Sequence, residues 1–173
     1  MSIIRFIADL HLGHKGMAEY RGFDSIEQHD NYVIKQWNSV VNKHDVTYIL
    51  GDVTMEKKKS YPLLDKLNGK KYVVLGNHDR RQDVTELLKY VQGVAGMVQY
   101  KGMFLTHCPV HPMEFDYRVY LNIHGHIHKK TVKRFFGLLP DKRYVGVSCE
   151  QVDFIPQTVD QIKSRYKLGV LKR

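Results

Sequence analysis

Cysteine is scarce in this chain. Its 173 residues include only two cysteines, Cys108 and Cys149, and they form no CxxC pair. So few thiols argue against a disulfide scaffold, and the missing CxxC pair argues against a structural zinc site. The pattern is typical of a reducing compartment, so we expect a cytoplasmic protein whose two thiols are free and buried.

Long apolar runs are also absent. No stretch approaches the roughly 18 apolar residues that a membrane span needs, so we expect no membrane partner. The apolar part of residues 1–9 is too short for a signal peptide and ends at Asp9, which favours a first core strand over residues 3–8. There is no internal repeat and no low-complexity linker. We therefore expect residues 1–173 to form a single domain that buries a sizeable core.

Acidic residues are outnumbered. The chain has 18 aspartates and glutamates against 27 lysines and arginines, a net charge of +9. This excess favours a polyanionic partner such as a nucleotide or a nucleic acid. The alternative is a solvated basic surface with no specific partner, of which a run such as Lys57-Lys58-Lys59 is typical.

Apolar β-type runs alternate with helical patterns through the first half of the chain. Ser25 and Gln28 have the spacing of a capping box at the start of a helix. The alternation favours an α/β fold with parallel strands and right-handed crossovers. The predicted strands are 3–8, 46–50 and 70–75, and the predicted helices are 25–42, 55–67 and 83–91, the last ended by Gly93.

The second half of the chain changes character. Residues 96–100 and 103–106 predict a hairpin around Lys101-Gly102. Two more strands are predicted over 119–123 and 143–148, followed by a short helix over 158–166 that Thr158 caps.

The segment Leu75-Gly76-Asn77-His78-Asp79 directly follows a predicted buried strand. Gly76 permits a sharp turn, after which an amide, an imidazole and a carboxylate leave the strand end together. In open α/β sheets, ligands bind beyond the carboxyl ends of the strands. Gly-Asn and His-Asp pairs also form ordinary turns, so the question is whether similar residues recur at other strand ends.

They do recur. Asp9 and His11 follow the first strand two residues apart, so in an extended segment both side chains would point to the same side. Five of the ten histidines stand just past predicted strands, which is not expected of histidines scattered through a core. The complete set is Asp9, His11, Asp52, Asn77, His78, His107, His126 and His128.

Without His78, these residues form two sets of metal ligands that share the carboxylate of Asp52. Nitrogen and oxygen ligands of this kind suit divalent Mn²⁺, Fe²⁺, Zn²⁺ or Ni²⁺. Two such ions, about 3.5–4 Å apart, are a recurrent device for displacement at phosphorus. The pattern therefore predicts a centre of two divalent ions, with Mn²⁺ as the first candidate.

The ordered motifs resemble the calcineurin-like metallophosphoesterases. The match covers roughly residues 1–150 and all five motif blocks are in family order. The resemblance implies a four-layer α/β/β/α sandwich of two mixed sheets flanked by helices, and the short chain leaves little room for a cap domain. The blocks are DxH (Asp9, His11), GD (Gly51-Asp52), GNHD (Gly76 to Asp79), a lone histidine (His107) and GHxH (Gly125 to His128).

The resemblance also implies roles for these residues. His78 would be the catalytic imidazole, oriented by Asp79, and a hydroxide bridging two ions would attack a phosphate ester. No serine or cysteine nucleophile is evident. The roles of His14, His111 and His124 stay open. By this resemblance Asp9, His11, Asp52 and His128 would hold one ion, and Asp52, Asn77, His107 and His126 the other.

Other hydrolase classes fit less well. The metallo-β-lactamase motif H-x-H-x-D-H fails because Lys129-Lys130 follows the histidines at 124–128. An HD-type phosphohydrolase places its His-Asp pair on helices, whereas His78-Asp79 follows a strand. A phosphodiesterase acting on nucleotides or nucleic acid is the favoured hypothesis. A phosphomonoesterase is the alternative, and a non-catalytic nucleic-acid-binding domain is a weaker one.

Overall fold

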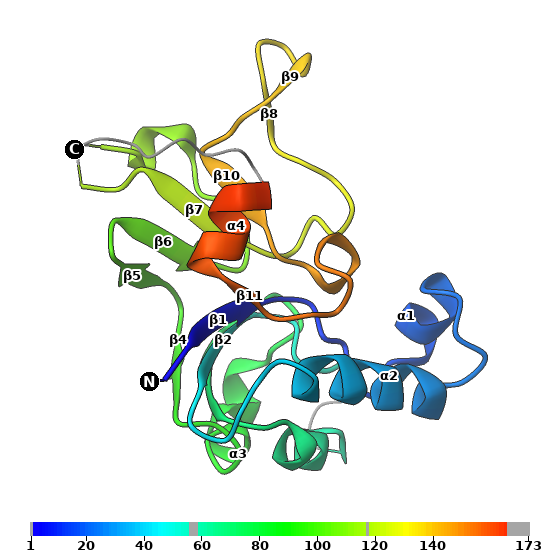
Figure 1. Ribbon diagram of the computed structural model, residues 1–173. Coiled ribbons are helices and arrows are strands. Elements are labelled where there is room, and N and C mark those ends of the chain that lie inside the picture. Colours follow the sequence, from blue (N-terminus) through cyan, green and yellow to red (C-terminus); the bar gives the residue numbers. More distant parts are fainter. Residues whose placement is uncertain (1, 56–58, 117, 166–173) are drawn as a thin grey trace.

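Two mixed β-sheets form the centre of the molecule (Figure 1), a computed structural model that describes residues 2–55, 59–116 and 118–165. In the first sheet the strand order is β11-β1-β2-β3-β4, with β1 to β4 parallel and β11 antiparallel to β1. Its strands are β1 (Ile4–Ile7), β2 (Val46–Leu50), β3 (Lys70–Val74), β4 (Gly93–Ala95) and β11 (Gln157–Thr158).

The second sheet has the order β10-β7-β6-β5 and is also mixed. Strands β10, β7 and β6 are parallel, and β5 is antiparallel to β6. A separate two-stranded hairpin, β8–β9, projects from the body of the molecule (Figure 1). These strands are β5 (Val98–Tyr100), β6 (Met103–Thr106), β7 (Leu121–His124), β8 (Lys133–Arg134), β9 (Leu139–Pro140) and β10 (Tyr144–Gly146).

Helices flank the sheets, as the sequence predicts. In Figure 1 the longest helix, α2, and the short α3 lie on the side of the first sheet away from the second, while α4 contacts β11 and β1. The α-helices are α1 (Lys15–Tyr20), α2 (Ile26–Asn38), α3 (Val84–Leu87) and α4 (Val159–Arg165). Short 3₁₀ helices are η2 (Tyr61–Lys66), η3 (Arg81–Asp83), η4 (Pro112–Glu114) and η5 (Cys149–Gln151).

The two sheets share one hydrophobic core and are joined at the end of β1. The Phe6 ring of the first sheet lies 6.0 Å from that of Tyr100 of the second, centroid to centroid. Beyond β1, Ala8 N donates to Val147 O at 2.9 Å, and Cys149 N donates to Ala8 O at 3.1 Å. This bridge holds the end of β1 beside the end of β10, so residues that follow either strand lie close together.

Several predicted helices are shorter than the sequence indicates. Within the predicted helix 55–67 the structure has the 3₁₀ helix η2, with Pro62 in its first turn, and residues 56–58 lie outside the described part. Over 83–91 the α-helical part is the four residues of α3, and Gly93 begins strand β4 rather than only ending a helix. These segments connect neighbouring parallel strands, and a short 3₁₀ or α-helical turn is long enough to make each connection.

Helix α2 begins where the sequence predicts but ends at Asn38 instead of 42. Ser25 Oγ accepts from Gln28 N at 3.1 Å, which confirms the N-cap. Gln28 Oε1 accepts from Asp24 N rather than Ser25 N. His29, Val33 and Trp37 recur every four residues, and all three are buried.

The hairpin around Lys101-Gly102 is confirmed as β5–β6, and both turn residues have positive φ, 47° and 75°. Thr158 Oγ1 accepts from Gln161 N at 3.2 Å, which confirms the cap of α4. Residues 166–173, including the predicted last residue of that helix, lie outside the described part. Among the described residues, no helix combines the length and the apolar character that crossing a membrane requires.

We expect Ser25→Ala to lower the free energy of unfolding by about 1 kcal/mol, because the backbone N–H of Gln28 loses its capping acceptor. Urea denaturation measures the loss. Ser39→Ala is the matched control at the other end of α2, since that hydroxyl only donates to Gln36 O. Equal losses in the two variants would show that the cap contributes nothing of its own.

Candidate functional site

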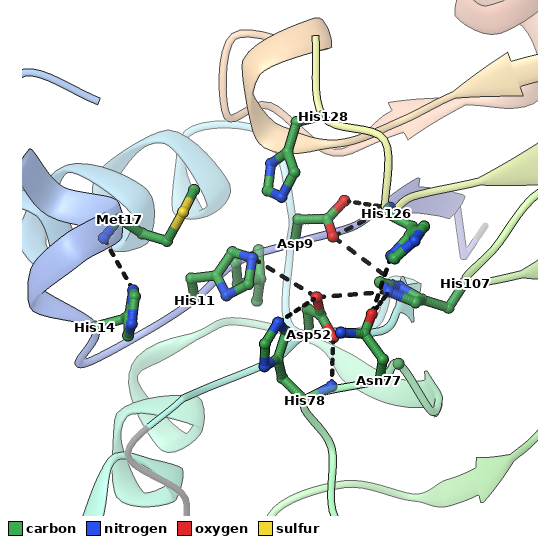
Figure 2. Close-up of polar contacts among 12 residues, drawn as sticks. Asp9, His11, His14, Met17, Asp52, Asn77, His78, His107, His126 and His128 are labelled. Carbon is green, nitrogen blue, oxygen red and sulfur yellow. Dashed lines mark hydrogen bonds and ion pairs between the residues drawn. The ribbon is translucent and has the colours of Figure 1, made fainter. Parts of the chain in front are cut away.

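The predicted polar residues converge where the strand ends of both sheets meet (Figure 2). They follow β1, β2 and β3 of the first sheet and β6 and β7 of the second. Backbone hydrogen bonds tie these segments together: Asp9 N donates to Gly51 O at 3.0 Å, His11 N to Asp52 O at 3.0 Å, and Gly125 N to His107 O at 2.9 Å. The expectation that one edge of the fold gathers these side chains is therefore met in the geometry.

The backbone at these residues is left-handed. Five of the seven predicted metal residues have positive φ, between 50° and 70°. The segment from Asp9 to His11 is therefore not extended, because the φ values of these two residues are 58° and 51°, yet their side chains still come together in one cluster. Such a backbone costs roughly 1–2 kcal/mol per non-glycine residue, and it clusters at functional sites. The five are Asp9, His11, Asp52, His126 and His128.

The first cluster comprises Asp9, His11 and His128, one oxygen or nitrogen of each lying within 4.8 Å of the others. Asp9 is fully buried and accepts from the backbone N of His126 at 3.0 Å. The imidazoles of His11 and His128 are nearly parallel, with centroids 5.5 Å apart.

The second cluster surrounds Asp52, His107 and Asn77. His107 Nε2 lies 3.5 Å from Asp52 Oδ2 and 2.8 Å from Asn77 Oδ1, which is also 3.0 Å from His126 Nδ1. The other ring nitrogen of His107 lies 2.9 Å from the carbonyl of Leu50 and donates to it, since that oxygen only accepts. This hydrogen bond orients the Nε2 atom toward Asp52.

Asp52 lies between the two clusters. Its Oδ2 atom is 3.8 Å from His11 Nε2, 3.5 Å from His107 Nε2 and 4.0 Å from His78 Nε2. Figure 2 shows these three rings around the one carboxylate, each from a different strand end. Asp52 thus has the central position that a shared ligand would need, and its role as a ligand of two ions stays a prediction.

His78 and Asp79 differ in their surroundings. The side chain of His78 is 40% exposed at the rim of the site, and its backbone N donates to Asp52 Oδ1 at 3.0 Å. Asp79 is buried and accepts from three backbone N–H groups: Asp52 at 2.8 Å, Val53 at 3.1 Å and Gly76 at 2.8 Å. These hydrogen bonds hold together the two loops that carry Asp52 and Gly76, and the orientation of the His78 ring by Asp79 stays a prediction.

Burial shifts the pKa values of two members of the first cluster, whereas the hydrogen bond with Glu150 raises the pKa of the third, His128. Burial, followed by the nearby charge of Arg21, lowers the pKa of His11 to about 2, and burial raises the pKa of Asp9 to about 6. His11 is therefore neutral near pH 7. Both of its ring nitrogens are buried without a hydrogen-bond partner among the described residues.

The buried nitrogens and oxygens of the site are of the kind that binds divalent ions. Buried polar atoms normally have a hydrogen-bond partner, but the two ring nitrogens of neutral His11, which lies beside Asp9 and Asp52, have none among the described residues. Neutral imidazole nitrogens and carboxylate oxygens are what borderline divalent ions bind. His107 also has the outer hydrogen bond typical of a histidine that binds metal. The residues therefore fit such ions.

The three histidines whose roles the sequence leaves open have structural partners. His14 Nδ1 accepts from Met17 N at 2.9 Å and caps α1, and its ring centroid lies 6.0 Å from that of His11 (Figure 2). His111 caps η4 in the same manner. His124 is buried beside the carbonyl of Gly125, and burial lowers its pKa to about 4. Cys108 is exposed, contrary to the expectation of two buried thiols, whereas Cys149 is buried as expected; both are free.

Two residues at the site are not predicted by the sequence motifs. Glu150 lies 3.1 Å from His128 Nδ1, and Arg21 forms a buried ion pair with Glu150. Neither belongs to a motif, and they are 129 positions apart. Burial would raise the pKa of Glu150, but the hydrogen bond with His128 and the charge of Arg21 lower it to about 2.

Comparison with known proteins agrees with this geometry. Residues 3–102 match the family model for calcineurin-like phosphoesterases. An uncharacterised protein of Methanocaldococcus jannaschii is 31% identical over 178 residues, which cover 100% of this chain and 96% of that protein. The gene 66 protein of Mycobacterium phage L5 is 40% identical over 84 residues, 46% of this chain and 41% of that protein.

A solved structure has the same fold. A protein of unknown function from Aquifex aeolicus aligns with a TM-score of 0.68 and 21% sequence identity, covering 95% of this chain and 100% of that chain.

We expect Gly76→Ala to destabilise the protein by about 1–3 kcal/mol, because a Cβ there would overlap the carboxylate and backbone nitrogen of Asp52. Gly96→Ala is the matched control, since its Cβ would meet no atom within 4 Å, and it should be neutral or slightly stabilising. Thermal unfolding compares the two variants. If Gly76→Ala unfolds at the wild-type temperature, the tight packing against Asp52 is not real.

Proposed function

Because the chain belongs to the calcineurin-like phosphoesterase family, we propose that it is a phosphodiesterase that holds two divalent ions and cleaves nucleotides or nucleic acid. The observation that carries the proposal is the carboxylate of Asp52, which three imidazoles from different strand ends surround. Asp9, His11, Asp52 and His128 would hold one ion; Asp52, Asn77, His107 and His126 would hold the other.

The chemistry that two divalent ions supply in such a site is activation of a water molecule and neutralisation of charge on the phosphoryl oxygens. His78 is the group of this chain suited to deliver a proton. Its partly exposed ring stands at the rim, within 4.0 Å of Asp52, where it reaches a leaving oxygen. Asp79 acts indirectly, because its three hydrogen bonds fix the backbone that presents Asp52 and His78.

The ligands favour a class of divalent ions rather than one ion. A mixed set of imidazole nitrogens and carboxylate oxygens suits Mn²⁺, Fe²⁺, Zn²⁺ or Ni²⁺, and we propose Mn²⁺ first. The two free thiols favour a reducing compartment such as the cytoplasm.

Basic residues that follow the metal-binding segments in the sequence favour a polyanionic substrate. Lys129 and Lys130 follow His128 directly, and Lys133 and Arg134 form strand β8 of the projecting hairpin (Figure 1). All four are exposed. Arg80 and Arg81, which directly follow Asp79, are exposed as well. These charges favour a substrate with several phosphates over a small ester.

The tip of the β8–β9 hairpin adds aromatic surface to this charge. Phe135 is 60% and Phe136 is 106% exposed, and both have positive φ, 51° and 55°. Tight turns normally place glycine or asparagine in that conformation, so two phenylalanines there are unfavourable for folding alone. Exposed aromatic rings next to cations are a common means of stacking unpaired bases. The hairpin therefore favours a single-stranded nucleic acid.

We expect His78→Ala to keep its divalent ions and lose roughly 10²–10⁴ in rate, the usual contribution of a proton donor. The loss should be smaller for a nitrophenyl ester, whose leaving group needs little protonation. Asp52→Asn is the contrasting variant, which should lose ions and activity together. Metal analysis and kcat/KM on activated and unactivated diesters measure both. Equal losses of rate on the activated and unactivated esters would show that His78 is not the proton donor.

For the substrate class, we expect cleavage of single-stranded DNA or RNA to depend more steeply on salt than cleavage of a nitrophenyl diester. Each phosphate contact should add about 0.7 to the slope of log(kcat/KM) against log salt, with its sign negative. Replacing Lys133 and Arg134 with Gln should flatten the slope for the polymer. Replacing Lys35 and Lys66 with Gln, exposed on α2 and η2, is the control and should not.

Equal slopes for the polymer and the small diester would contradict the nucleic-acid hypothesis and leave a small-molecule diesterase. A preference for phosphomonoesters across the same screen would favour a phosphatase instead.

A further inference from the structure

A buried ion pair lies directly behind the first cluster of the site. Arg21, the last residue of the turn that ends α1, and Glu150, in η5, have side chains only 2% and 4% exposed. Arg21 Nε and Nη2 lie 2.9 Å and 2.8 Å from the same oxygen of Glu150, Oε1. That oxygen also lies 3.1 Å from His128 Nδ1.

The guanidinium of Arg21 connects three parts of the chain. Besides Glu150, it donates through Nη2 to the carbonyl of Asp9 at 2.7 Å and through Nη1 to the carbonyl of Leu10 at 3.0 Å. One side chain thus binds the left-handed segment that carries Asp9 and also binds Glu150, the partner of His128. Its position fixes the two sides of the cluster relative to each other.

The network also fixes where protons lie. Arginine only donates, so His29 Nε2, 2.8 Å from Arg21 Nη1, accepts. His29 Nδ1 then carries the proton and donates to Asp30 Oδ1 at 2.8 Å, and the Asp30 carboxylate accepts from Gly13 N at 3.0 Å. Each nitrogen and oxygen of the network thus has a defined role, and Glu150 Oε1 accepts because its partner Arg21 only donates.

The same reasoning applies to His128. An ionised carboxylate only accepts, so the proton of a neutral His128 ring lies on Nδ1 and the lone pair on Nε2. This is the arrangement that His107 has with the carbonyl of Leu50. A ring held in this way presents an unprotonated nitrogen to Asp9 and His11.

Stability alone does not explain the pair. Burying a guanidinium and a carboxylate gains little net stability, because desolvation offsets their attraction. Glu150 Oε2 is moreover buried without a hydrogen-bond partner among the described residues. An apolar pair would fill the same space at lower cost, so the retained charges favour a role in orienting the site.

We propose that Glu150, anchored by Arg21, is a positioning residue that holds the His128 ring with its proton on Nδ1 and its Nε2 atom directed at Asp9 and His11. The metal-binding part of this inference rests on the proposed function. The placement of the proton does not, and it is a property of the metal-free protein.

The first test is the ¹⁵N–¹H NMR spectrum of the imidazoles in the metal-free full-length chain at alkaline pH, with His128 assigned from the spectrum of His128→Gln. We expect one tautomer for His128, protonated on Nδ1. Glu150→Gln should keep that tautomer, because the amide oxygen still accepts. A proton on Nε2 in the wild type, or rapid averaging of the two tautomers, would overturn the proposal.

The second test is Mn²⁺ affinity by calorimetry. Glu150→Gln should weaken it by about 10–100-fold, the usual effect of losing a charged partner behind a histidine ligand. Asp141→Asn is the matched control: it breaks another Arg–carboxylate pair, with Arg143 at 2.7 Å, that lies outside the site, and should leave affinity unchanged. Unchanged affinity in Glu150→Gln, or an equal loss in Asp141→Asn, would refute the role.

The two proposals fail in different ways. If the wild type binds no Mn²⁺ yet shows the Nδ1 tautomer, the proposed function is wrong and the orientation of His128 by Glu150 stands.

Discussion

The carboxylate of Asp52 is where the histidines contributed by the two sheets meet. Imidazoles that follow β1, β3 and β6 lie 3.5 to 4.0 Å from its Oδ2 atom, and the backbone around it is held by Asp79. Two mixed sheets must therefore end at the same place for the site to exist. The hydrogen bonds between Ala8 and the end of β10 enforce that alignment.

The cost of building the site is local and visible in the backbone. Left-handed φ at Asp9, His11, Asp52, His126 and His128 means that the surrounding contacts must hold these residues against their own preference. Deep burial of Asp9 and His11 adds a cost of desolvation, which appears as opposite shifts in their pKa values. A protein selected for stability alone would not concentrate both costs in one place.

The Arg21–Glu150 pair and the β8–β9 hairpin represent two further layers around this centre. The pair lies behind the site, buried, and acts on its geometry. The hairpin projects from the body of the molecule, exposed and basic, and under the proposed function it would contact the substrate. The two differ in burial. The buried positive charge of Arg21 binds the carboxylate of Glu150, whereas the positive charges of Lys133 and Arg134 are exposed to solvent.

The sequence by itself determined the α/β alternation, the caps at Ser25 and Thr158, and which residues gather at the strand ends, because periodicity, capping and strand polarity are local properties. Tertiary structure decided the lengths of η2 and α3, the left-handed turns at Asp9 and His11, and the partners of Asp79. It alone brought Arg21 to Glu150 across 129 positions. Such contacts depend on how two sheets pack, and no pattern within a short window of sequence contains that information.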